Sequence, residues 1–177
     1  MSNVIEWLRT LLTYLANSIG SILVHLRRSR NEKGEHDPVT EDEFVLRRIH
    51  KNNYKPQQNP PVLRVAFEPK DEDHDGLSFH RRLFVSAEDL GFSGRKPGEY
   101  YVASFSVAIL RGPDYQLTIN PAPHPDPTEP RGHCVIPQLS IDHLEADAEK
   151  SKSIQRKLAK LASANIVYVP ADCIVAP

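Results

Sequence analysis

Three aspartates with alternate spacing stand in residues 71–76, which read Asp-Glu-Asp-His-Asp-Gly. Asp71, Asp73 and Asp75, followed by a glycine, match the opening of an EF-hand calcium loop, in which alternate carboxylates converge on one hard cation. Position 12 of such a loop is a bidentate glutamate, whereas this chain has Arg82 there and continues into a strand-like segment. Two interpretations remain, a metal site or a solvated acidic turn, and the mismatch favours the turn.

Two short basic runs supply side chains that could hold an anion. Residues 47–50 read Arg-Arg-Ile-His, and residues 80–82 read His-Arg-Arg. Guanidinium groups bind phosphate in a bidentate manner, so the two runs predict a pocket for a phosphate or a nucleotide if they are neighbours in space. The alternative is that alternate members of each run point to solvent. The predicted ligand-binding residues are Arg47, His50, His80 and Arg82.

Histidine and cysteine residues are further candidates. His133 and Cys134 are adjacent, and adjacent residues of a strand point to opposite faces, which argues against a nucleophilic Cys–His pair. A metal site made of His50, His80 and His133 finds no support in their spacing. The two cysteines of the chain also fit no metal-binding spacing, so we interpret them as buried free thiols in a reducing environment. The sequence predicts no cofactor.

These residues must be positioned by strands and helices, and the sequence patterns of those elements predict an α+β domain with a small mixed or antiparallel sheet. Runs rich in β-branched and aromatic residues predict about five or six short strands. Apolar residues spaced i, i+4, i+7 and i+8 from Ile154 predict one main C-terminal helix. Phe44–Ile49 fits either a strand or the end of a helix that begins at the capping box Thr40-x-x-Glu43. The other predicted strands include residues 62–67, 77–85, 101–109, 133–136 and 166–169.

An apolar seam marks the N-terminal segment, residues 1–28. Residues 4–26 fit a single membrane span, an amphipathic helix on a membrane or in a coiled coil, or a helix packed on its own domain. We expect this segment to bind a membrane or a partner helix, and a homo-oligomer is one form of the latter. Polar residues 29–38 predict a linker to a globular α+β domain, residues 39–177. The seam residues are Ile5, Leu8, Leu12, Leu15, Ile19, Ile22 and Leu26.

Length and charge limit the classes of protein that fit. A chain of 177 residues is long enough for one domain with a core and an appendage. Its formal net charge of −1 gives no general attraction to nucleic acid or to anionic lipid, so the sequence carries no strong nucleic-acid signal.

Three short motifs carry a resemblance to other proteins. They are Arg47-Arg48-Ile49-His50, Ala66-Phe67-Glu68-Pro69 and Asp73-His74-Asp75-Gly76-Leu77-Ser78. From about Phe44 to Val169 the chain resembles a family of small bacterial proteins of unknown function that share Arg-Ile-His, Ala-Phe-x-Pro and Gly-Leu-Ser steps. The resemblance implies no activity. In a bacterium, basic residues 27–30 after a span would keep the domain on the cytoplasmic side of the inner membrane, and a cytoplasmic protein is the alternative.

Three functional hypotheses follow from the sequence. The first is a binding or regulatory module of unknown ligand, tethered by its N-terminal helix. The second is an enzyme that acts on a nucleotide or a phosphate-bearing substrate, with a histidine for acid–base chemistry. The third is a structural component that oligomerises through the seam. The chain contains no complete catalytic motif, so the sequence does not decide whether it is an enzyme.

Overall fold

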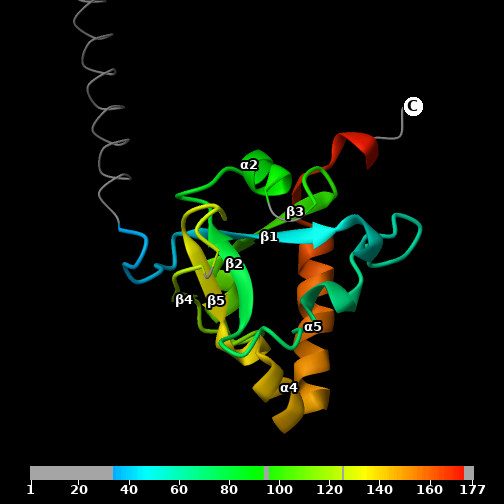
Figure 1. Ribbon diagram of the computed structural model, residues 1–177. Helices are drawn as coiled ribbons and strands as arrows, with labels where there is room; N and C mark the ends of the chain where they lie inside the picture. The colour runs from blue at the N-terminus through cyan, green and yellow to red at the C-terminus, as the bar shows by residue number, and fades with distance from the viewer. Residues whose placement is uncertain (1–33, 94–95, 125, 174–177) are drawn as a thin grey trace, which may run out of the picture. The chain divides into compact units, whose positions relative to one another are not determined.

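The computed structural model describes residues 34–93, 96–124 and 126–173, and the chain from Glu35 onward forms one compact unit (Figure 1). The predicted N-terminal helix, residues 1–28, and residues 29–33 of the predicted linker lie outside the described residues. Within the described part of the chain, no helix is both long enough and apolar enough to cross a membrane.

Six strands form one antiparallel sheet in the order β4-β5-β2-β1-β3-β6. The prediction of an α+β domain is confirmed, and α5 is its main helix. The strands are β1 (Phe44–His50), β2 (Leu77–Arg81), β3 (Tyr100–Ser106), β4 (Asn120–Pro121), β5 (His133–Ile136) and β6 (Ile166–Tyr168). The α-helices are α2 (Ala87–Phe92), α3 (Val107–Arg111), α4 (Ile141–Ala146) and α5 (Ala148–Ser163). The 3-10 turns are η1 (Lys51–Asn53), η2 (Arg64–Phe67), η3 (Pro137–Leu139) and η4 (Ala171–Cys173).

The two faces of the sheet bury different apolar clusters. Residues directly opposite each other in antiparallel strands share a face, so Val45 and Phe105 point the same way. They belong to the larger cluster, which includes the buried apolar residues of α5. Leu46 and Val102 point to the other face and pack with Leu90 of α2. Alternation along β1 therefore decides which side chains enter the core beneath α5.

The sheet opens between β1 and β2, near its middle. These two strands pair only at Val45↔Arg81 and Leu46↔His80, although β1 continues to His50. Beyond that point β1 stays paired with β3, and β2 stays paired with β5. In Figure 1, β2 curves away from β1 where this happens. Backbone carbonyls of β2 that face the opening therefore need hydrogen-bond donors other than β1.

Two segments differ from their predicted secondary structure. Residues 62–67 were expected to be a strand, but they form one bridge, Tyr54↔Val62, and the 3-10 turn η2. Phe67 is buried and packs edge-on against Phe105, with ring centroids 6.0 Å apart. Packing of η2 against the core thus overrides local β propensity. Likewise, the alternation through residue 109 predicts one long strand, whereas β3 ends at Ser106 and α3 follows.

A buried ion pair ties the start of the domain to β2. Arg81 is fully buried, and its Nε and Nη2 lie 2.8 and 2.9 Å from the two carboxylate oxygens of Glu43. Its Nη1 donates to the carbonyls of Glu35 at 3.1 Å and Asp37 at 2.8 Å. Part of the predicted linker therefore contacts the domain. Glu43 also accepts from Thr40, as a capping box requires, but its carboxylate is held by Arg81 and the chain enters β1 instead of a helix.

Candidate functional site

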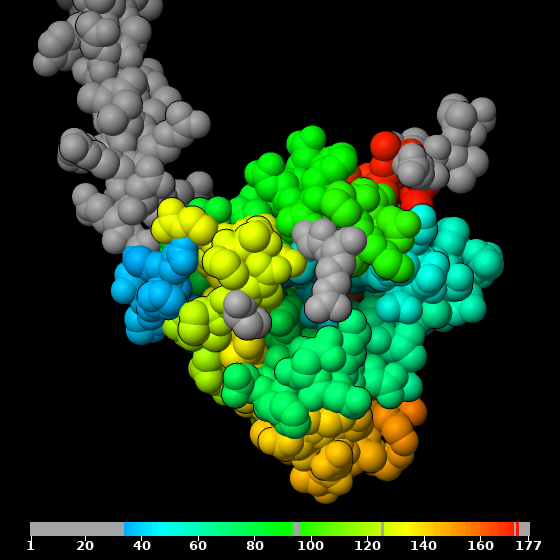
Figure 2. Space-filling view, in the orientation of Figure 1, coloured from blue at the N-terminus to red at the C-terminus, as the bar shows by residue number. Residues whose placement is uncertain are grey.

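A cavity of about 840 Å³ occupies the opening between β1 and β2. Its walls come from β1, β2, β3 and β5 and from two connecting segments, residues 68–76 and residues 122–124 with 126–129. Both segments lie on the face that Figure 2 shows, the first in blue-green and the second in yellow. The volume is within the range of small-molecule sites, roughly 300–1,000 Å³.

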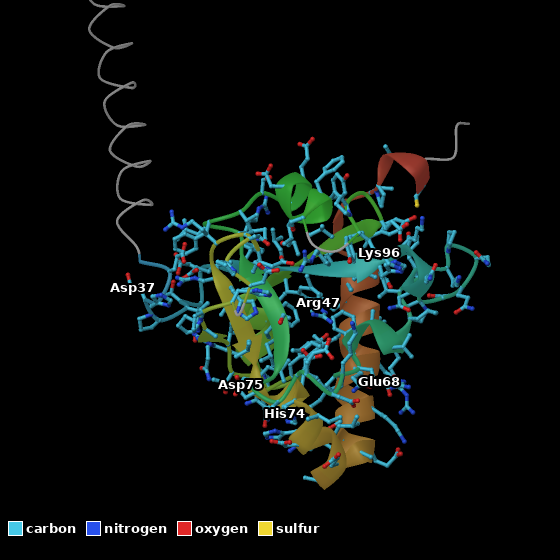
Figure 3. All side chains as sticks on the ribbon, viewed as in Figure 1. Asp37, Arg47, Glu68, His74, Asp75 and Lys96 are labelled. Carbon is cyan, nitrogen blue, oxygen red and sulfur yellow. The ribbon has the colours of Figure 1, made fainter. Side chains whose placement is uncertain are left out.

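Arg47 of β1 lies where the two strands separate. Its Nη1 donates to the carbonyl of Ser78 at 2.6 Å, and its Nε and Nη2 donate to the carbonyl of Ala66 at 3.3 and 3.0 Å. The guanidinium packs 5.8 and 5.4 Å from the ring centroids of Phe67 and Phe79. Burial lowers the pKa of Arg47 to about 10, so the group stays charged at neutral pH. Figure 3 shows Arg47 near the middle of the domain.

Arg48, the next residue, forms a second basic wall and has a carboxylate partner. Its Nη2 lies 3.0 Å from Oε2 of Glu129, and its Nη1 donates to Ser93 Oγ at 3.0 Å. The approach to Glu129 makes an ion pair by distance but not a well-aligned hydrogen bond. The guanidinium also stacks over Tyr100, 5.4 Å from the ring centroid. Arg48 thus has a carboxylate partner at ion-pair distance, whereas Arg47 hydrogen-bonds to backbone carbonyls.

Three histidines pack together next to the cavity: His124 and His133 line it, and His80 does not. His80 on β2 and His133 on β5 are register partners, and their ring centroids are 5.5 Å apart. His124 packs against both rings, at 6.2 Å from His80 and 4.6 Å from His133. Burial, followed by the charge of Arg48, lowers the pKa of His80 to about 3. Burial also lowers the pKa of His133, so both rings are neutral at pH 7.

The tautomer of His133 follows from its surroundings. Its Nδ1 lies 3.1 Å from the carbonyl oxygen of Ala122, and a carbonyl can only accept, so Nδ1 carries the proton. The opposite nitrogen, Nε2, is then an acceptor. It is buried and has no hydrogen-bond partner in the described structure, and the same holds for Nε2 of His80. His133 is 7% exposed and lines the cavity, whereas His80 is 3% exposed and lies behind it.

Acidic side chains surround the mouth of the cavity. Glu72, Asp75 and Asp126 line it and are exposed, and Lys70 is the exposed base among them. Figure 3 shows Glu68 and Asp75 on the segment below Arg47. The half-buried lining therefore combines Arg47 and Arg48 with the acids Glu68, Asp73 and Glu129, and the exposed mouth is mainly acidic.

The structure brings only two of the three predicted metal residues, Asp71, Asp73 and Asp75, to the cavity. Asp73 accepts a hydrogen bond from the backbone amide of Lys70 at 2.8 Å, which closes a local turn. Asp71 does not line the cavity, whereas Asp73 and Asp75 do. Across residues 34–173, apart from 94–95 and 125, no group of three or more His, Cys, Asp and Glu side chains is placed to hold a metal ion.

The four predicted ligand-binding residues are not all at the cavity. Arg47 lines it, and His80 packs against two histidines of its wall. His50 lies outside the lining and pairs with Glu99 at 2.9 Å. Arg82 is exposed and also lies outside the lining. Phe44–His50 is a strand, so Arg47 and His50 belong to opposite faces of β1.

Sequence reasoning assigned no pocket role to His124, Glu129 or Tyr100, whereas Arg48 belongs to the basic run 47–50 from which a pocket was predicted. His124 and Glu129 belong to a proline-rich connection with no periodic pattern, so no local signal places them near β2. The argument against a Cys–His pair holds: Cys134 is buried in the core cluster while His133 faces the cavity. Burial raises the pKa of Cys134 to about 12, so it is an inert thiol at neutral pH.

The arrangement can hold an anionic group on Arg47, and His133 contributes to the lining from the opposite face of the sheet. Comparisons of the chain with protein-family models, curated proteins and solved structures gave no match.

Proposed function

We propose that the domain is a binding module that takes a small anionic ligand into the cavity between β1 and β2. The observation that carries the proposal is the state of Arg47. A guanidinium has five N–H donors, and three hydrogen bonds of Arg47 go to backbone carbonyls. No carboxylate among the described residues hydrogen-bonds to it, although the negative charge of Asp73 offsets part of the cost of its burial.

A cation in this position gains from an anionic partner. Carbonyl dipoles offset only part of the cost of burying a full charge, and the remaining two N–H groups suit a planar or tetrahedral oxyanion. Arg81 provides the comparison inside the same protein, because its guanidinium is fully buried and Glu43 compensates the charge. Arg47 lines a cavity instead of a packed core, which supports a ligand as the missing partner.

Inorganic phosphate is expected to bind the full-length protein at pH 7 and constant ionic strength. Arg47→Lys should weaken that binding at least about 10-fold, because lysine is a point charge without the two-pronged donor geometry. Calorimetric titration measures the affinity, and the histidine ring signals in proton NMR report whether the anion enters the cavity. Acetate, titrated in parallel, distinguishes a phosphate site from a carboxylate site.

Arg82→Lys is the matched control, because Arg82 is exposed and lies outside the cavity. It should leave phosphate affinity unchanged. The proposal fails if neither anion shifts the histidine signals of the native protein. It also fails if the two lysine variants weaken binding equally.

An enzyme acting on a phosphate-bearing substrate is the second candidate. The neutral ring of His133 in the cavity wall favours it, because a neutral imidazole can accept a proton. Such an enzyme would hold the phosphate on Arg47 as the binding module does. Release of inorganic phosphate from a bound ester would distinguish the enzyme from the module.

We also propose that residues 1–28 attach this module to a membrane or to a partner helix. The apolar seam and the basic cluster that follows it support attachment. In bacterial cells the full chain should sediment with membranes, whereas a chain that begins at Gly34 should stay soluble. Starting at Gly34 keeps the carbonyls of Glu35 and Asp37 that Arg81 binds. Release by high salt or alkaline carbonate would indicate peripheral attachment, and identical location and oligomeric state of both chains would disprove a tether.

A further inference from the structure

We infer that the ligand is a small zwitterion, whose acid group binds Arg47 while a nearby amine binds the carboxylate of Asp73. An amino acid has this pair of groups, and so has a phosphorylated amine. The inference rests on the proposed anion-binding function and adds the chemical class of the ligand. It starts from the connection between η2 and β2, residues 68–76.

One guanidinium holds the chain on both sides of this connection. Arg47 donates to the carbonyl of Ala66 before it and to the carbonyl of Ser78 after it. Asp73 lies within the connection, and Arg47 and Asp73 are both half-buried and line the cavity. Burial lowers the pKa of Arg47 and the negative charge of Asp73 raises it, so the two groups interact through space. The cavity therefore presents a cation and an anion from neighbouring parts of its wall.

These two charged groups are not paired with each other. The hydrogen bonds of Arg47 go to backbone carbonyls, and Oδ2 of Asp73 accepts from the backbone amide of Lys70 at 2.8 Å. Among the described residues, neither Arg47 nor Asp73 forms a salt bridge. Each carboxylate oxygen accepts more than one hydrogen bond, so Asp73 keeps capacity for a donor from a ligand. A molecule with an acid group and an amine satisfies both residues at once.

The charge of the connection disfavours an anion that lacks an amine. Residues 68–76 contain five carboxylates and one lysine. Four of these carboxylates line the cavity, namely those of Glu68, Glu72, Asp73 and Asp75. They repel an isolated anion on Arg47, although solvent and salt weaken the effect. An amine joined to the anion offsets this repulsion, because it brings a positive charge to the same carboxylates.

The test is a calorimetric comparison of matched probes on the full-length protein at pH 7 and constant ionic strength. β-Alanine is propionate with an added amine, and 2-aminoethyl phosphate is ethyl phosphate with the same addition. The amine is expected to tighten binding about 10-fold in at least one of the two pairs, the size of one charge-assisted hydrogen bond. The pair that binds more tightly also distinguishes a carboxylate ligand from a phosphate ligand.

Two asparagine variants locate the amine. Asp73→Asn removes the charge but keeps an oxygen that accepts from the amide of Lys70, so the local turn is preserved. It should bring the affinity ratio within the pair close to one, and propionate should bind at least as tightly as to the native protein. Asp71→Asn is the matched control, because Asp71 is an exposed residue of the same connection and does not line the cavity. It should keep the native ratio.

Failure of the inference is distinguishable from failure of the proposed function. If propionate or ethyl phosphate binds and the amine adds no affinity, the zwitterion assignment is wrong while the anion site stands. The assignment is also wrong if Asp71→Asn lowers the ratio as much as Asp73→Asn does. If no probe binds, both are wrong, and ethylamine that binds as tightly as β-alanine would overturn the anion site itself. Should Asp73→Asn not fold, Asp73→Ser replaces it, since a serine hydroxyl also accepts from a backbone amide in such a turn.

Discussion

The Arg81→Met variant is expected to lose about 3–5 kcal/mol of its free energy of unfolding, which is a large fraction of the stability of a small domain. Methionine fills much of the volume of arginine but removes the two charged hydrogen bonds that Arg81 donates to the carboxylate of Glu43, which is 8% exposed. The carbonyls of Glu35 and Asp37 lose a donor at the same time. Urea unfolding followed by circular dichroism measures the change through the transition midpoint.

Two further variants isolate the cause. Arg82→Met changes the adjacent, exposed arginine and should alter the free energy of unfolding by less than about 0.5 kcal/mol. The double variant Arg81→Met, Glu43→Leu removes both charges and should recover most of the loss, because an apolar pair can replace a buried ion pair at little cost. If the double variant is as unstable as Arg81→Met, loss of the ion pair with the buried Glu43 carboxylate is not the reason.

Gly76→Ala is expected to destabilise the domain by about 3 kcal/mol or more, since two separate costs add. Gly76 precedes β2 and has φ of +123°, a conformation that L residues rarely adopt. A Cβ there would also lie 2.4 Å from the carbonyl oxygen of Ile136, and this backbone atom belongs to β5. Since Gly76 lines the cavity, the variant should also weaken phosphate binding.

Gly98→Ala is the matched control for that prediction. Gly98 also has positive φ, +77°, but among the described residues, its two chain neighbours aside, no atom lies within 4 Å of its added Cβ. It should lose only about 1–2 kcal/mol from backbone strain. The difference between the two alanine variants, measured by urea unfolding, isolates the steric clash with β5. Equal losses would mean that β2 and β5 can move apart to accommodate a methyl group.

Local sequence patterns correctly predicted those elements whose tertiary contacts favour the same conformation as their local propensity. Residues 133–136 were predicted as a strand and form β5 with the same bounds. Ser86 is a residue type that commonly caps helices, and its hydroxyl accepts from the amide of Asp89 at 3.0 Å at the start of α2. Residues 62–67 have equal β propensity, yet their contacts with α5 and Arg47 come from distant parts of the chain. Such contacts decide the conformation and leave no local trace in the sequence.

The site was only partly predictable for the same reason. Arg47 could be recognised as a candidate because a guanidinium group binds anions. The face on which its side chain lies could not be assigned, because residues 44–49 fitted either a strand or a helix. The strand assignment separates Arg47 from His50. His124 and Glu129 reach the cavity only because their proline-rich segment lies against β1 and β5, through Arg48 and His133. Contacts between segments so far apart in the chain depend on the topology of the whole fold, so the local sequence could not predict them.

The two edges of the sheet have a consequence for behaviour at high protein concentration. β4 has two residues, one of which is Pro121 without an N–H group, and β6 has three residues, with Pro170 shortly after it. A register shift between Val102 and Ala103 further distorts the pairing of β6 with β3. Short, irregular, proline-flanked edges are poor templates for strands of other molecules. The sheet is thereby protected from edge-to-edge aggregation, and partners of this domain would have to approach its helices and loops.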